Sequence, residues 1–345
     1  MKGRKAGGAL LRVMNRKNGS VNRQPDSLGG ALRLGLLLLA GLPAITLATE
    51  NTPRPPFAQW AEVPAIGQLV VGGYYEQSES YYVWQGHQRH NITIHAADGE
   101  SYGIDIRQGY LTLDYGITKQ LAADLVVGAA SMGWRSFNPG AAVEQTTGMM
   151  DFTLGIRYQL VQETTNSSWP PTLTARLAAI LPGTYNENFP FAPGNHAVGM
   201  EPSILLRKHL GWTGFGVWGD ALFRWMSNPA SDQYIAGFGL FQQVKRWELD
   251  VGYRHLQSIT GENLVLVPPA TGNPPPWDSI YYPRDVREIS DAIDSGFSYT
   301  TRKNWRWSFH ARKTFDGSNT DSKLWLGGSV EIPFDHLFGR GKETP

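Results

Sequence analysis

Met150-Asp151-Phe152-Thr153-Leu154-Gly155-Ile156-Arg157-Tyr158-Gln159-Leu160 alternates between two kinds of side chain without a lapse. Every even position is apolar or aromatic, and every odd position is polar or glycine. Successive side chains of a β-strand point to opposite faces, so this stretch predicts a strand with one apolar face and one polar face.

The same alternation recurs along most of the chain. It is clear in residues 247–254 and 305–312, has small lapses in 110–117, 172–181 and 215–225, and is weaker in 67–76, 121–132, 199–209, 233–242, 289–299 and 323–332. Together with 150–160 these are twelve segments of roughly 8–12 residues, close to the length of a tilted membrane strand. Helical periodicity is nearly absent among them, so the sequence predicts an all-β protein.

The first 48 residues are built differently from the remainder. They hold eight Lys or Arg, one acid and no aromatic residue, and they end in an uncharged, Leu-rich run over 34–48. This run is shorter than the roughly 20 residues of a spanning helix, follows a basic stretch and ends in small residues. Residues 1–48 are therefore predicted to be a secretory signal peptide, the alternative being a retained inner-membrane anchor.

The composition of the remaining chain excludes several classes of protein. It carries all 40 aromatic residues and a formal charge of −6, which gives no reason to expect a nucleic-acid partner. The chain has no Cys, which excludes disulfide scaffolds and Cys-ligated metal sites. The charged fraction of 18% is low for a soluble domain.

Alternation alone does not say which face of the strands is inside. A soluble sandwich buries its apolar faces, whereas a membrane barrel turns them to lipid. Three features favour the barrel. The polar faces carry glycine and opposite charges (Asp151 and Arg157, Asp220 and Arg224, Asp250 and Arg254), and Tyr and Trp gather near strand ends, as in membrane-interface belts.

The third feature is the length of the connections. The connections 118–120, 210–214, 243–246 and 300–304 are short, and 77–109, 133–149, 182–198 and 255–288 are long. Outer-membrane barrels alternate short periplasmic turns with long outer loops. The predicted fold is thus an antiparallel transmembrane β-barrel of about 12 strands over 67–334, with a periplasmic N-terminal segment over 49–66 and a C-terminal tail over 335–345.

Four short motifs resemble a known family. They are Tyr115-Gly116-Ile117-Thr118-Lys119-Gln120-Leu121, Leu181-Pro182-Gly183-Thr184-Tyr185, the stretch 194–210 and Phe315-Asp316-Gly317-Ser318-Asn319-Thr320. Their order and spacing are similar to those of outer-membrane proteins of the phenol meta-cleavage (MetA) pathway family, and cover about residues 110–334. The resemblance implies a barrel of about a dozen strands that moves small, often aromatic, compounds across the outer membrane of a Gram-negative bacterium. It implies no functional residue individually. The chain departs from such barrels in continuing past Phe334, where they commonly end on an aromatic residue.

If the apolar faces meet lipid, a set of charged residues lines the lumen. The candidates are Asp114, Asp151, Arg157, Arg176, Asp220, Arg224, Glu248, Asp250, Arg254, Arg306, His310, Arg312 and Glu331. Either the basic members attract an anionic solute or they pair with the acids, and pairing is favoured because a confined charge needs a partner. Twelve strands enclose a passage narrower than that of a 16-stranded porin.

The long loop over 261–288 holds Trp277, Tyr281 and Tyr282 beside two proline runs. Either the loop folds inward as a constriction or binds an apolar solute with these aromatic residues, or it is a stiff, polyproline-like outer loop. The two interpretations are equally compatible with the sequence.

Two rival functions remain open at this stage. A barrel enzyme acting on lipid would pair Ser78, Ser80 or Ser101 with His87, His90 or His95, although no nucleophile-elbow or zinc-helix motif is present. A secreted, soluble β-protein with a binding role is the other. The sequence favours a non-enzymatic outer-membrane channel for small hydrophobic or aromatic compounds, with no cofactor and no metal. Its partners would be that solute and the lipid.

Overall fold

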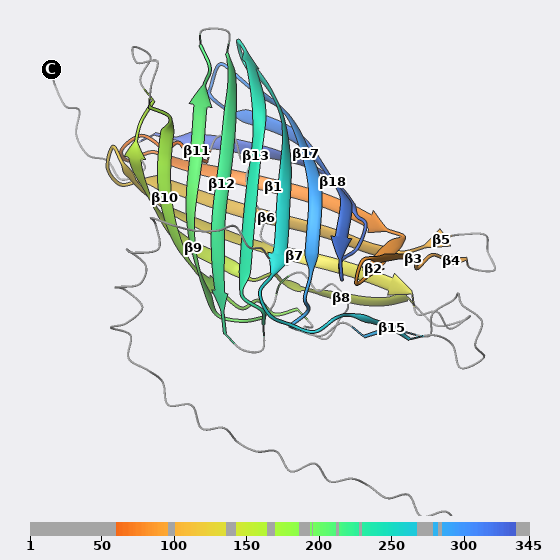
Figure 1. The fold of residues 1–345 in the computed structure, drawn as a ribbon. Coiled ribbons are helices and arrows are strands. Elements are labelled where there is room, and N and C mark those ends of the chain that lie inside the picture. The colour runs from red at the N-terminus through yellow and green to blue at the C-terminus, as the bar shows by residue number, and fades with distance from the viewer. Residues whose placement is uncertain are drawn as a thin grey trace, which may run out of the picture. The chain divides into compact units, whose positions relative to one another are not determined.

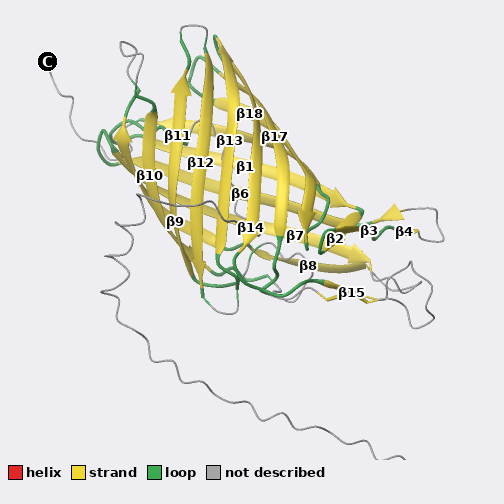
Figure 2. Cartoon of the chain, viewed as in Figure 1, coloured by secondary structure: helices red, strands yellow, loops and turns green. Residues whose placement is uncertain are grey.

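The computed structural model describes residues 60–95, 101–135, 143–163, 170–185, 194, 196–211, 214–227, 230–267, 279–281 and 285–335. Within these ranges the chain is built almost entirely of strands (Figure 2). None of the described residues belongs to a helix long and apolar enough to cross a membrane. The predicted signal peptide, 1–48, lies outside the described residues.

Twelve antiparallel strands form a closed ring (Figure 1). They are β1 (Leu69–Ser80), β6 (Ile104–Gly116), β7 (Leu121–Arg135), β9 (Phe152–Val161), β10 (Thr172–Leu181), β11 (Gly199–His209), β12 (Phe215–Met226), β13 (Gln233–Val244), β14 (Trp247–Ser258), β17 (Ile289–Thr300), β18 (Arg306–Ser318) and β19 (Leu324–Phe334). Each pairs with the strands before and after it, and β1 pairs with β19 from Leu69↔Phe334 to Glu79↔Leu324. The ring leaves no wall strand with an unpaired edge, as a spanning sheet requires.

All twelve predicted segments are strands, so the predicted fold class is confirmed. Several strands extend beyond the alternating segments that predicted them. For example, β1 reaches Ser80 and β18 reaches Ser318, where the outward positions include the exposed Glu79 and Lys313. The alternation fades there because the outward face is polar, and it therefore marks only the apolar part of each strand.

The long connections carry additional short strands. The hairpin of β2 (Tyr82–Gln85) and β3 (Gln88–Asn91) follows β1, the pair β4 (Ile94–His95) and β5 (Ser101–Tyr102) comes next, and β15 (Val265–Val267) pairs with β16 (Ser279–Tyr281). A further strand, β8 (Val143–Met149), pairs with Ala129–Arg135 of β7, while β9 pairs with its first half. Thus β8 and β9 occupy one place beside β7, with a break at Met150 and Asp151 between them.

Large apolar side chains cover the outside of the barrel. Leu154, Ile156, Tyr158 and Leu160 of β9 are 47–56% exposed, and Phe238 of β13 is 63% exposed. The alternate residues of β9, Thr153, Gly155, Arg157 and Gln159, are buried inside. Near the short turns, the Trp247 ring lies 4.4 Å from that of Tyr299 and 4.9 Å from that of Phe297, as expected of an interfacial aromatic belt. The apolar face is therefore the lipid face.

This orientation predicts a depth-dependent cost for a charge on β13. Phe238→Arg places a guanidinium in the middle of the strand's lipid face and should cost about 2–4 kcal/mol of folding free energy in a bilayer. Val244→Arg, at the short-turn end of the same strand and also exposed (55%), should cost about 0–1 kcal/mol. Urea unfolding in lipid vesicles measures both, and equal costs would contradict a spanning orientation.

Candidate functional site

The chain ahead of β1 enters the barrel at the end with the short turns. Arg157 donates from Nη1 to the backbone oxygens of Trp60 (2.7 Å) and Glu62 (3.2 Å). The Ala61 oxygen accepts from Thr174 Oγ1 (2.5 Å) and Gln159 Nε2 (3.4 Å). We call residues 60–62 the plug. Part of the segment expected in the periplasm, 49–66, thus lies inside the wall, because interior donors of β9 and β10 satisfy its carbonyls.

The Trp60 indole lies between charged and aromatic parts of the interior. The guanidinium carbon of Arg176 is 4.9 Å from a Trp60 ring centroid and that of Arg157 is 5.2 Å away, which are cation–π distances. Trp60 also packs against an apolar cluster that includes Tyr74, Tyr110 and Val126. Tyr74 and Tyr110 are buried and stack at 5.8 Å.

The arginines under the plug belong to a chain of charges that runs from strand to strand. Arg157 pairs with Asp114 and lies 3.7 Å from Asp124; Arg176 joins Asp124 to Glu201 (2.7 Å each). Arg224 continues the chain from Glu201 (2.6 Å) to Gln233 (2.9 Å). Three acids and three arginines are linked, so this first chain has no net charge.

Two further chains connect strands between β11 and β18. In the second, Arg254 links Asp220 (3.2 Å) to Asp294 (3.1 Å), and Asp294 also binds Arg312. In the third, Glu248 lies between Arg207 (2.9 Å) and Arg306 (3.2 Å), and Arg207 also faces Glu62 of the plug at 3.6 Å. Each chain balances its acids with arginines. The arginines of these three chains are all paired with acids, so they form no separate anion-attracting patch.

The pairs differ from those read along single strands. Asp220 pairs with Arg254 of β14, and Arg254 also pairs with Asp294 of β17. Residues four apart on a strand are about 13 Å apart, whereas facing residues on neighbouring strands are about 5 Å apart, so partners come from neighbouring strands.

Four remaining lumen candidates have other surroundings. Asp151 lies at the break between β8 and β9, where its carboxylate accepts from Gly183 N (2.9 Å) and His196 N (3.2 Å) and holds the loop after β10. His310 Nε2 lies 3.4 Å from Glu76, and Glu331 accepts from the Tyr74 hydroxyl. Asp250 lies on β14 with its carboxylate against Gly296 of β17.

The sequence interpretation missed several members of the chains. Asp124, Glu201, Arg207 and Asp294 are buried in the lumen, and Glu76 is 8% exposed. All lie on segments with weak alternation (67–76, 121–132, 199–209 and 289–299). Counting inward positions by twos from the better-defined strands, through the predicted register, would have found them.

Loops close the opposite end of the barrel. The lid consists of 82–92, 262–266, 285–288 and 319–323. Its apolar residues Val83, Ile92, Leu264, Leu266 and Val286 form one buried cluster with inward residues of β6, β7 and β19, including Trp325. Both ends of the described lumen are therefore occupied by chain.

Asn319 ties the pieces of the lid together. Its Nδ2 donates to Asn263 Oδ1 (2.8 Å) and to the Arg287 oxygen (2.6 Å), and its Oδ1 accepts from Gly86 N (3.0 Å). Asn319 has φ +53° and is 1% exposed. Within the motif over 315–320, Asp316 Oδ1 accepts from the neighbouring Gly317 N at 2.8 Å, while Asn319 connects its loop to two other loops.

A cavity of about 380 Å³ lies beside the plug. Its lining includes Trp60, Asp114, Val126, Arg306 and Glu331. The Arg306 side chain is 6% exposed, and its Nε and Nη1 have no hydrogen-bond partner among the described residues. The cavity thus combines an aromatic ring, carboxylates and unused N–H donors.

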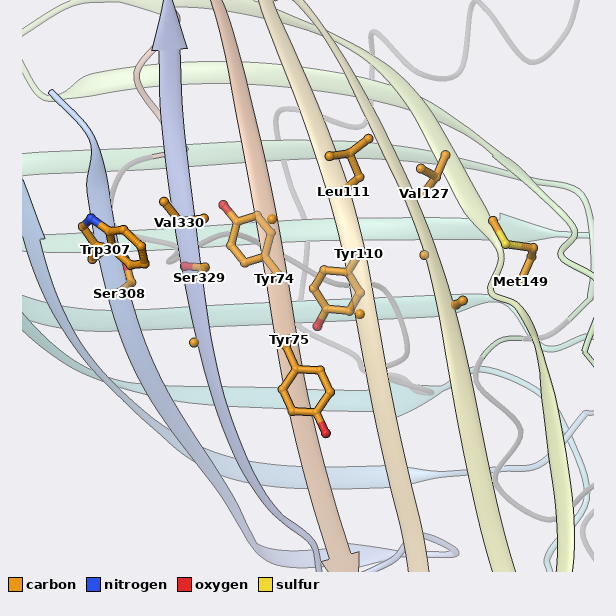
Figure 3. Close-up of a pocket in the computed structure, with 15 residues that line it drawn as sticks. Tyr74, Tyr75, Tyr110, Leu111, Val127, Met149, Trp307, Ser308, Ser329 and Val330 are labelled. Carbon is orange, nitrogen blue, oxygen red and sulfur yellow. The ribbon is translucent and has the colours of Figure 1, made fainter. Parts of the chain in front are cut away.

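Figure 3 shows a second hollow, of about 680 Å³, across β18, β19, β1, β6 and β7. Its lining includes the outward-facing Tyr75, Leu111 and Trp307 and the outward glycines Gly73, Gly109 and Gly328. Glycine has no side chain to fill the wall surface, so this hollow is a shallow groove on the lipid face.

The side chains of the three loop aromatics that were predicted to bind a solute are not described by the structure. Trp277 and Tyr282 lie outside the described residues, and Tyr281 is described only as backbone of β16. Of the predicted serine nucleophiles, Ser80 is fully buried and donates to the Tyr82 oxygen at 3.0 Å. No group of three or more described His, Cys, Asp or Glu residues is arranged to hold a metal ion.

A closed antiparallel barrel with a lipid-facing exterior and a charged interior defines an outer-membrane β-barrel protein of a Gram-negative bacterium.

The comparisons with known proteins agree with this class. No protein-family model matches the sequence, and no curated protein matches it. Among solved structures, the chain is similar to an outer membrane channel from Pseudomonas putida F1, with 17% identity and a TM-score of 0.58 over 82% of this chain and 100% of that one. It is less similar to the translocator domain of the autotransporter NalP from Neisseria meningitidis, with 12% identity and a TM-score of 0.42 over 79% and 90%. The first likeness shows a shared fold.

Proposed function

We propose that this protein is an outer-membrane channel that passes small hydrophobic or aromatic compounds. The observation that carries the proposal is that the wall is complete without the segments that fill it. Twelve paired strands close the barrel, whereas the plug and the lid are added from outside the ring and held by hydrogen bonds and ion pairs. A passage therefore forms when these segments move, without breaking the wall.

Two further points support the channel. The solved structure from Pseudomonas putida F1, which shares the fold, is an outer membrane channel, and the sequence motifs resemble a family linked to phenol degradation. The aromatic and apolar cluster of Tyr74, Tyr110 and Val126 inside the barrel offers a surface against which an aromatic solute can pack.

Conductance and solute uptake test the proposal. Purified protein in planar bilayers should show single-channel currents, and liposomes that contain it should take up a single-ring aromatic faster than empty liposomes. A barrel that neither conducts nor speeds uptake, even after the residues up to 66 are removed, would contradict the proposal.

The paired charges predict how ion selectivity changes. Arg306→Ala combined with Arg312→Ala removes two positive charges and leaves Glu248 and Asp294 with one arginine each. The lumen becomes more negative by two charges, so the reversal potential in a salt gradient should move toward cation preference. Arg302→Ala, on an exposed turn, should leave the reversal potential unchanged.

A further inference from the structure

We infer that the Trp60 indole occupies the binding site of the transported solute, and that this site takes a neutral, single-ring aromatic compound with a carbonyl oxygen next to the ring. The inference rests on the proposed channel function and adds the class of solute and the way in which it competes with the plug.

The groups around the Trp60 ring favour an aromatic solute. Two guanidinium groups, of Arg157 and Arg176, lie 5.2 and 4.9 Å from the Trp60 ring, and the Tyr74–Tyr110 cluster packs against it. A guanidinium over a ring favours a π-system over a saturated ring of the same size. Trp60 itself precedes the first wall strand and belongs to no strand, so another ring can replace it without disturbing the barrel.

The carbonyl oxygen beside the Trp60 ring is held by donors of the barrel wall. The Trp60 carbonyl accepts from Arg157 Nη1 at 2.7 Å, and the next carbonyl, of Ala61, accepts from Thr174 and Gln159. These donors are fixed on β9 and β10 and remain when the plug leaves. A solute that brings its own carbonyl satisfies them, whereas a pure hydrocarbon leaves buried donors unpaired, which is costly.

The charges around the site favour a neutral solute. Arg157 and Arg176 are balanced by Asp114, Asp124 and Glu201, so the site has no surplus positive charge. The adjoining cavity adds Glu331, which further disfavours an anion. Its volume of about 380 Å³ suits a compound of one ring, and the unused Nε and Nη1 of Arg306 can bind an oxygen as the solute enters.

Binding to plugged and unplugged protein tests the inference. Benzamide is the probe, since it joins a ring to a neutral carbonyl; cyclohexanecarboxamide keeps the carbonyl and lacks the π-system. Calorimetry on the mature protein in detergent should show that Trp60→Ala binds benzamide at least about tenfold more tightly than the wild type, because a plug that occupies the site lowers the competent fraction. Trp60→Phe, which keeps a ring, should give an intermediate affinity.

The controls separate competition from other effects. Ile66→Ala alters an exposed residue of the same segment and should leave the affinity unchanged. Cyclohexanecarboxamide and benzoate should bind Trp60→Ala at least about tenfold more weakly than benzamide does. The heat-dependent shift on gels shows that each variant is a folded barrel.

The outcomes also distinguish this inference from the channel function. Equal benzamide affinities in the wild type and Trp60→Ala, or tighter binding of benzoate or cyclohexanecarboxamide, would overturn the inference even if the protein conducts. Tight benzamide binding by Trp60→Ala in a protein that never conducts would overturn the channel and leave the site. Benzamide should also raise the open probability of the wild type several-fold and leave that of Trp60→Ala unchanged.

Discussion

Arg157→Ala should destabilise the barrel by about 3–5 kcal/mol, because it leaves buried acids uncompensated. The Arg157 side chain is completely buried and contacts Asp114, Asp124 and two plug carbonyls. Loss of the Arg157 guanidinium leaves Asp114, whose side chain is only 17% exposed, without this partner. It also removes the hydrogen bonds that hold the plug. Urea unfolding in vesicles should show the lower stability, and planar bilayers should show longer openings than in the wild type.

Matched variants separate burial from charge. Arg107→Ala removes the same side chain from an exposed pair with Asp105 (3.0 Å) and should cost less than about 1 kcal/mol. Arg157→Lys keeps the charge but cannot reach both carboxylates and both carbonyls, so its stability should lie between those of the wild type and Arg157→Ala. Equal losses for Arg107→Ala and Arg157→Ala would show that the lumen pairs are solvated.

Asn319→Ala should open the lid at a cost of about 2–4 kcal/mol, since it removes three hydrogen bonds of a buried amide and leaves the Gly86 N–H without this acceptor. Alanine is also less favourable than asparagine at a positive φ. Proteolysis should cut the 82–91 hairpin faster than in the wild type, and channel currents should become larger.

The backbone effect has its own control. Asn304 has φ +60° but lies on an exposed short turn away from the lid. Asn304→Ala has the same conformational cost and should leave proteolysis of the hairpin unchanged. Similar behaviour of the two variants would assign the effect to the backbone and contradict a role of the Asn319 amide in closing the lid.

The alternation of side chains was sufficient for the wall of the barrel. Lipid favours apolar side chains and the lumen favours polar ones. The residue types of Ile156 and Arg157 therefore predict which face each occupies, and no information from distant parts of the sequence is needed. Ion pairing was foreseen as a rule, but the partners were not, because the Asp220–Arg254 pair depends on which strands are neighbours and on their register.

The plug and the lid were beyond this kind of prediction. Trp60 and Ala61 lie in a segment without periodicity, and their place is decided by donors 95–113 residues away. The same holds for Asn319, whose partners lie on two other loops. Local pattern carries no information on such contacts, although a lone Trp just before the first strand is a feature that merits a search for an interior partner.

The contacts of the plug bear on how the barrel assembles. Its hydrogen bonds are made with β9 and β10, and Gly67 N also binds the Gly116 oxygen at the end of β6. None of these partners belongs to β17, β18 or β19, whose pairing with β1 completes the ring. Residues 60–67 can therefore settle against the first half of the wall while the sheet is still open. Their placement depends on β6, β9 and β10, and not on the β1–β19 pairing that closes the ring.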